Sequence, residues 1–227
     1  MLEEVNFKIV VLDLISGRID KTSPADVKTI ANFSKPLTDY LSSINFKVLV
    51  VGHGIGGAAV TYAMEMNPDK IEKAIFVQAV MPKDGETPGL YINGQLATLA
   101  AQDVLNYNFN DKGVATSISI NTTVAPWYLF NRSPREDKIL GMALLTDSPY
   151  AILNEVMHLT PGNYGSIKRF YITTYMDRYF PASVQKQIYT NNPPKAKFIL
   201  KNGDHSPFFS EAPYLFNHLR SLANSQW

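Results

Sequence analysis

The stretch that decides the fold spans residues 47–82 and reads KVLVVGHGIGGAAVTYAMEMNPDKIEKAIFVQAVMP. It opens with four apolar residues, 48–51, a run typical of a strand that is buried on both faces in a parallel sheet. A turn of very small residues follows, and then a helix over 58–66 that an Asn-Pro pair ends. A second apolar strand, 74–80, completes a β-α-β unit. The pattern therefore predicts an α/β fold built around this unit.

The turn between the first strand and the helix reads Gly-His-Gly-Ile-Gly-Gly, residues 52–57. It matches the nucleophile elbow G-x-S-x-G, in which a sharp turn exposes a serine at the end of a strand. Gly54 stands at the serine position, so the scaffold for a nucleophile is present and the hydroxyl is absent. Loss of a triad nucleophile costs on the order of 10⁶ in turnover. A conventional serine esterase is therefore not expected.

The whole block resembles the plant methylesterase and hydroxynitrile-lyase group of α/β-hydrolases, whose elbow reads roughly VGHSLGG. The shared text runs in order without gaps: VGHGIGG at 51–57, AME at 63–65, Pro68, KI at 70–71 and MP at 81–82. A second match is YGSIKRFYI at 164–172, where the family has YGSVKRVYI.

The resemblance implies one α/β-hydrolase domain with a shortened, mostly parallel sheet, flanking helices and a small helical cap. Residues 1–82 would form the N-terminal part of the core, 83–160 the cap region and 161–227 the C-terminal part of the core. Further elements are expected as strands at 7–14, 169–174 and 196–200 and as helices at 137–145, 182–189 and 212–223. Another helix is expected within 27–44, where Pro36 either interrupts it or limits it.

The order of the first elements departs from the family. In the relatives, a strand that ends in a His-Gly loop precedes the equivalent of residues 7–14 and lies in the middle of the sheet. We expect this strand to be missing here. Either residues 7–14 pair directly with 48–51, or a sheet edge and apolar surface are exposed. In the relatives, the loop after this strand supplies one of the two N–H donors of the oxyanion hole. Without it, only the backbone N–H of Ile55 is expected to remain.

Two other parts of a hydrolase triad are implied by the resemblance. Asp177, in Met-Asp-Arg, stands at the family's acid position, and His205, in Gly-Asp-His, stands at the position of the catalytic histidine. The acid would orient the imidazole and stabilise its charge. The plainer alternatives are a loop histidine without a role and an ordinary surface carboxylate. Ser206 replaces the lysine of the hydroxynitrile lyases, which argues against cyanohydrin cleavage.

Three further polar residues are given simpler interpretations. Asp204 is expected to be a turn residue. His53 packs beneath the elbow in the relatives and is given no catalytic role. His158 and His218 lack the spacing of metal ligands, so no metal is expected.

The cap region is rich in aromatic and apolar residues among Gly, Asn, Thr and Pro. In the relatives this region lines the substrate pocket. Trp127, Phe130 and Met142 are the candidate substrate-binding residues, together with Tyr128 and Leu129. The alternative is that they only pack the cap onto the core, which is the usual role of aromatic side chains.

Composition limits the partners. The chain has 227 residues, a net charge of +1 and 45% hydrophobic residues, as in an ordinary globular protein. No basic stripe indicates nucleic acid, and no apolar run approaches the roughly 20 residues of a membrane span. There is no cysteine, so disulfides and thiolate sites are excluded. We expect a cytoplasmic protein without cofactors, with a small carboxylate or ester as ligand and a possible homodimer as its assembly.

Three functions follow from these residues and remain open at this point. The first is a serine-independent methylesterase-like protein that acts on or binds small carboxylic compounds or their methyl esters, of the salicylate, jasmonate or indole-acetate type. The second is a non-catalytic binding protein. The third is a β-keto acid decarboxylase, because the methylketone synthases of this group have also lost the serine.

Overall fold

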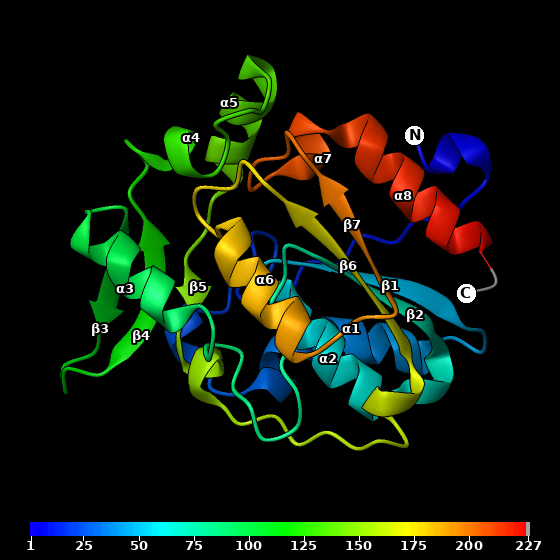
Figure 1. Ribbon diagram of the computed structural model, residues 1–227. Coiled ribbons are helices and arrows are strands. Elements are labelled where there is room, and N and C mark those ends of the chain that lie inside the picture. Colours follow the sequence, from blue (N-terminus) through cyan, green and yellow to red (C-terminus); the bar gives the residue numbers. More distant parts are fainter. Residues whose placement is uncertain (226–227) are drawn as a thin grey trace.

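A four-stranded parallel sheet lies at the centre of the computed structural model, which describes residues 1–225 (Figure 1). The strand order is β1-β2-β6-β7, with β1 Val48–His53, β2 Ile71–Val77, β6 Lys168–Thr174 and β7 Ala196–Leu200. All three neighbouring pairs are parallel. This is the short parallel sheet that the sequence predicts. Because the carboxyl ends of parallel strands share one edge, the loops after these strands meet there.

Helices cover both faces of the sheet: α1 Ile30–Ser43, α2 Gly56–Met66, α6 Ala182–Asn191 and α8 Ala212–Asn224. Phe76 and Tyr171 belong to the apolar cluster shared with α1, α2 and α6. Ile75 and Phe170 belong to a second cluster, shared with α8. Neighbouring residues of a strand point to opposite faces, so each strand feeds both clusters.

Helix α1 runs without interruption through Pro36, which resolves the alternatives left by the sequence. Thr29 caps its start by accepting a hydrogen bond from the Asn32 N–H. The buried face, which includes Phe33 and Leu41, packs against the main core. This packing offsets the backbone hydrogen bond that proline removes.

The cap region contains strands as well as the expected helices. Its helices are α3 Asn93–Ala101, α4 Ala125–Tyr128 and α5 Arg135–Leu144. Strands β3 Leu105–Phe109, β4 Ala115–Ile120 and β5 Ser148–Pro149 form a separate antiparallel sheet. Gly113 at φ 72° lies in the turn between β3 and β4, where a positive φ favours glycine. The cap is therefore mixed, and the description as a helical cap covers only part of it.

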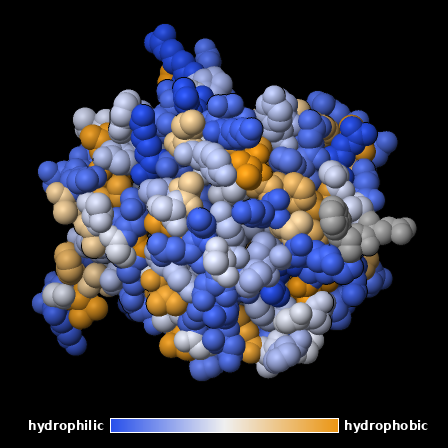
Figure 2. Space-filling model, in the orientation of Figure 1, coloured by the Kyte–Doolittle hydropathy of each residue, from blue (hydrophilic) through white to orange (hydrophobic). Residues whose placement is uncertain are grey.

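Short elements complete the chain: α7 Pro207–Ser210 and the 3₁₀ helices Glu3–Val5, Pro24–Asp26, Pro68–Lys70, Ala151–Asn154 and Tyr164–Ser166. Figure 2 shows apolar residues scattered among hydrophilic ones over one face of the molecule. Among the described helices, none has both the length and the apolar character that crossing a membrane requires.

The prediction of a strand at residues 7–14 is wrong. This segment forms neither strand nor helix, and the side chains of Val10 and Val11 are 43% and 89% exposed. Strand β1 therefore stays at the sheet edge, and Val51 is 47% exposed there. Of the two expectations, the exposed edge holds. An apolar run forms a strand only where a neighbour accepts its backbone hydrogen bonds, and sequence pattern alone does not show that neighbour.

The other predicted elements are confirmed with shifted ends. The final strand, 196–200, has the predicted bounds, whereas the strand predicted at 74–80 lies at Ile71–Val77. Strand β2 ends before Gln78, whose left-handed φ of 45° interrupts the extended backbone.

Candidate active site

The elbow turn keeps its sharp geometry although it carries no nucleophile. Gly54 lies between β1 and α2 with φ 55°, a conformation that glycine adopts readily. A Cβ built on Gly54 would have no heavy atom within 4 Å, so open space stands where a side chain would project. At Gly57 a Cβ would lie 2.0 Å from the Val80 carbonyl oxygen. Glycine there lets the start of α2 pack closely against the segment after β2.

His205 and Asp177 meet at the carboxyl edge of the sheet, after β7 and β6 respectively. The Nδ1 of His205 lies 2.9 Å from Oδ2 of Asp177. A carboxylate oxygen accepts, so Nδ1 carries the proton and the neutral ring has its lone pair on Nε2. The side chains are 12% and 0% exposed. The pair can therefore take up or release a proton at Nε2, as a general base or acid.

The buried Asp177 carboxylate is held by three donors besides the imidazole. Its Oδ1 accepts the backbone N–H groups of Tyr179 at 2.9 Å and Phe180 at 2.7 Å. Its Oδ2 also accepts from Nε2 of Gln78 at 3.1 Å. These bonds compensate the burial of the carboxylate and fix its orientation toward His205.

Gln78 is a polar contributor that sequence reasoning missed. Its buried amide nitrogen donates to the Asp204 carbonyl at 2.6 Å and to the Thr174 hydroxyl, in addition to Asp177. The available signal was a lone amide at the end of an apolar strand, in Phe-Val-Gln-Ala-Val. The amide joins the loops that follow β2, β6 and β7.

His53 forms a hydrogen bond to the backbone of the loop that carries His205. Its Nε2 lies 2.8 Å from the backbone oxygen of His205, so this nitrogen is the donor, and the two rings are 4.9 Å apart. Burial, followed by the nearby His205, lowers the pKa of His53 to about 3. His53 is therefore neutral near pH 7 and acts through the position of His205.

Asp204 has a larger role than that of a turn residue. Its buried Oδ2 accepts the N–H groups of Arg132 and Ser133 at 2.7 and 2.8 Å and the Ser133 hydroxyl at 2.9 Å. Its Oδ1 accepts from Ser206 N–H at 2.9 Å and from the Ser210 hydroxyl at 2.8 Å. One carboxylate thus ties the cap to the loop that carries His205.

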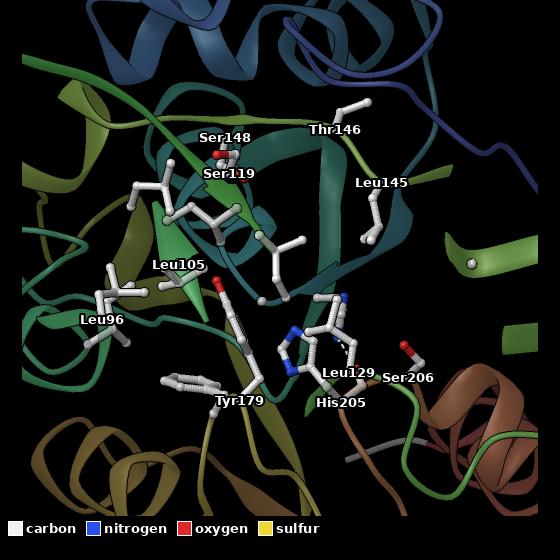
Figure 3. A pocket seen from close by; sticks show the side chains of 18 of the residues that line it. Leu96, Leu105, Ser119, Leu129, Leu145, Thr146, Ser148, Tyr179, His205 and Ser206 are labelled. Atoms are coloured by element: carbon white, nitrogen blue, oxygen red, sulfur yellow. Dashed lines mark hydrogen bonds between the residues drawn. The ribbon is translucent and has the colours of Figure 1, made fainter. Parts of the chain in front are cut away.

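A cavity of about 390 Å³ lies beside the dyad (Figure 3). His53, Gly54, Ile55 and His205 line it, and most other lining residues are apolar. Ile55 is the N-cap of α2, where backbone N–H groups have no intrahelical acceptor, as an oxyanion donor requires. The volume is in the range of small-molecule sites.

Tyr179 is a second cavity residue that the sequence analysis did not select. Its ring lies 4.7 Å from the ring of His205, and its hydroxyl points away from that ring into the cavity in Figure 3. Burial, followed by the negative charge of Asp177, raises the pKa of Tyr179. The phenol therefore stays protonated and can donate a hydrogen bond.

Only part of the predicted substrate-binding set lines the cavity. Phe130 and Leu129 do so. Trp127 lies outside the lining: the residue is 60% exposed, and the Arg178 guanidinium lies 3.4 Å from the centroid of its ring. Met142 is also outside the lining and packs against the apolar cluster of Ala125, Leu129 and Phe130. A run of apolar residues does not show which of them face inward, because that depends on how the cap folds.

No set of three or more His, Asp or Glu side chains within residues 1–225 is arranged to hold a metal ion.

Comparisons with known proteins show similarity in sequence and in fold. The chain is 33% identical over 228 residues to a candidate chloroplastic methylesterase, number 11, of Arabidopsis thaliana, with 98% of this chain covered. The crystal structure of the Arabidopsis methylesterase MES16 superposes with a TM-score of 0.85 at 28% identity and covers 98% of this chain and 89% of that one. Tomato methylketone synthase I complexed with 2-tridecanone superposes with a TM-score of 0.82 at 25% identity, with coverages of 98% and 89%.

Two further findings limit these similarities. The chain spans 58% of the length of the first of these relatives. No protein-family model matches the chain.

Proposed function

Because the chain belongs to the methylesterase-like α/β-hydrolases, we propose that it binds small carboxylic esters and acts on them without a serine nucleophile. The observation that carries the proposal is the 2.9 Å hydrogen bond between His205 and Asp177, beside an elbow that presents Gly54 to the same cavity. The ligand class is that of salicylate, jasmonate or indole-acetate methyl esters, which would place the protein in plant hormone metabolism.

The proposed reaction is direct attack by water. A water molecule in the open space at Gly54 would lose a proton to Nε2 of His205 and attack the ester carbonyl carbon. The backbone N–H of Ile55 would stabilise the oxyanion. The tetrahedral intermediate would then expel methanol, which takes the proton from His205, and leave the carboxylic acid. General base catalysis of this kind contributes about 10²–10⁴ in rate, far less than a full triad.

Decarboxylation of a β-keto acid is the second candidate. It needs no serine, since loss of carbon dioxide leaves an enolate that one proton converts to the ketone. His205 in its protonated form would supply that proton. The likeness to a methylketone synthase that was crystallised with 2-tridecanone favours this alternative.

A binding protein without catalysis is the third candidate. The cavity would persist after catalysis is lost, because the hydrogen bonds that hold the His205 loop do not involve the side chain at position 54.

Hydrolysis of methyl esters by the native chain and by His205→Ala separates these functions. We expect slow native hydrolysis that His205→Ala abolishes and that His158→Ala, an exposed histidine outside the site, leaves intact. Turnover of a β-keto acid but not of esters would replace the first function with the second. Ligand-induced thermal stabilisation without turnover of either would leave only binding. The homodimer and the cytoplasmic location stay predictions.

A further inference from the structure

Tyr179 carries a hydroxyl group for which the fold provides no partner. The residue lines the cavity, and its hydroxyl points away from the ring of His205 into that space (Figure 3). Within residues 1–225, the one hydrogen bond of Tyr179 is that of its backbone N–H to Asp177. The phenol is therefore free to bind a ligand.

Two other buried tyrosines show the ordinary arrangement. The Tyr171 hydroxyl donates to the Ala79 carbonyl oxygen at 2.9 Å, and the Tyr164 hydroxyl accepts from Asn192 at 2.6 Å. Buried hydroxyl groups have such partners because desolvation without a hydrogen bond costs free energy. Most residues that line the cavity around Tyr179 are apolar, so a ligand or a water molecule must supply the partner of its hydroxyl.

One carboxylate fixes Tyr179 relative to His205. Oδ1 of Asp177 accepts the backbone N–H of Tyr179 at 2.9 Å, and Oδ2 lies 2.9 Å from Nδ1 of His205. The centroids of the two rings are 4.7 Å apart. The position of the phenol is thereby tied to the position of the imidazole. A ligand held at His205 can meet the hydroxyl only with a second group that lies at a defined distance along its chain.

The surroundings of the phenol favour a neutral oxygen over an ionised one. Burial, followed by the negative charge of Asp177 and the phenol of Tyr107 on β3, raises the pKa of Tyr179. The charge of Asp177 would repel a second negative charge at the same place. Among the described residues that line the cavity, none is a Lys or Arg that could offset this repulsion. A neutral carbonyl oxygen accepts a hydrogen bond from the phenol without this cost.

We propose that Tyr179 determines ligand specificity: its hydroxyl donates a hydrogen bond to a neutral carbonyl oxygen that the ligand carries apart from the group at His205. The proposal deepens the proposed function and rests on it for the placement of one end of the ligand at His205. A ligand without this second oxygen leaves the phenol unpaired and binds more weakly. The position of the carbonyl along the ligand chain decides whether it reaches the hydroxyl.

A set of matched probes tests the second oxygen. The reference is methyl octanoate, and four analogues carry a ketone at carbon 4, 5, 6 or 7 of the same chain. Calorimetric titration near pH 7 should give one ketone isomer that binds about threefold to tenfold more tightly than the reference, the effect of one neutral hydrogen bond. Monomethyl suberate, which carries a carboxylate at the chain end, should bind more weakly than methyl octanoate.

Tyrosine variants test the assignment to one hydroxyl. Tyr179→Phe keeps the ring and should remove the advantage of the best ketone isomer over methyl octanoate. Tyr171→Phe is the matched control, because it removes a buried hydroxyl that has a partner and does not line the cavity. The control should keep the full advantage and should unfold at a lower urea concentration than the native chain. Tyr179→Phe should unfold at the native concentration or a higher one, because it removes an unpaired hydroxyl.

Four results would overturn the proposal. They are a ketone advantage that survives in folded Tyr179→Phe, no advantage for any of the four isomers in the native chain, tightest binding of monomethyl suberate, and a fall in the urea midpoint of Tyr179→Phe equal to that of Tyr171→Phe. The second result would mean that water alone is the partner of the hydroxyl.

Titration of folded His205→Ala, checked by circular dichroism, separates failure of this proposal from failure of the proposed function. That variant should lose turnover of the esters and keep the preference for the best ketone isomer. Preference without turnover in the native chain would refute only the catalytic proposal. Turnover of the esters without any ketone preference would refute only the role of Tyr179.

Discussion

The elbow turn and the histidine loop differ in how much of their chemistry they retain. At the elbow, Gly54 offers a left-handed backbone and open space. In the loop, hydrogen bonds tie His205 and Asp204 to β1, to the segments that follow β2 and β6, and to the cap. The comparison teaches that the histidine loop is held by hydrogen bonds that do not require a nucleophile at the elbow.

The largest expected effect is that of Gly54→Ser, which would add a hydroxyl at the elbow. We expect a gain of about 10³-fold in ester hydrolysis, less than the roughly 10⁶ that a nucleophile provides in a complete triad. The shortfall follows from an oxyanion hole with Ile55 as its one predicted donor, since each donor is worth about 10²–10³. Steady-state kinetics on a methyl ester measure the gain, and Gly54→Ser with His205→Ala should lose it. No gain in a folded Gly54→Ser would show that the dyad is misplaced.

Asp204→Ala should be the costliest change to stability in the histidine loop. It leaves the N–H groups of Arg132, Ser133 and Ser206 without their acceptor. We expect a loss of about 3–5 kcal/mol in the free energy of unfolding, measured in urea. A loss below about 1 kcal/mol would mean that Asp204 does not clamp the cap.

Gly54→Ala should cost less than Asp204→Ala. A Cβ fits there without a clash, and the cost is that of a left-handed backbone, about 1–2 kcal/mol. Gly162→Ala is the matched control, since its site is also open and its φ is not left-handed. Equal losses of unfolding free energy for the two variants, measured in urea, would contradict a left-handed backbone at Gly54.

A pH dependence of stability is expected from His53, and over a single pH unit it is the smallest of these effects. Its folded pKa of about 3 lies below the ordinary value of 6.5, so the unfolded chain binds more protons between these values. Stability should therefore fall as pH drops from 6.5 toward 3, by at most about 1.4 kcal/mol per unit and less because His53 is half-buried. Thermal unfolding of His53→Gln should show a shallower fall, and an unchanged slope would reject this assignment.

The elbow unit was predictable because its signals are local. An apolar run, a glycine turn and an Asn-Pro stop define β1, α2 and β2 within one stretch. The dyad was predicted only through the resemblance, since nothing in the spacing of Asp177 and His205 selects them. Gln78 could not be assigned, because its three acceptors, at the end of β6 and in the loops after β6 and β7, are distant from it in the sequence.

The structure differs from the sequence-based expectations where tertiary packing decides the outcome. Residues 7–14 have the composition of a strand, but no neighbouring strand pairs with them. In the cap, Phe130 turns inward while Trp127, three residues before it, stacks under Arg178 at the surface. Tertiary packing decides which of these side chains points inward. In an irregular segment, the pattern of apolar residues does not predict this direction.

The most direct test of the proposal that Gly54 stands where a nucleophile would stand is labelling with a fluorophosphonate, followed by measurement of the intact-protein mass. We predict no adduct on the native chain, one adduct on Gly54→Ser, and none when His205→Ala is added. An adduct on the native chain, or a folded Gly54→Ser that stays unlabelled, would contradict this account.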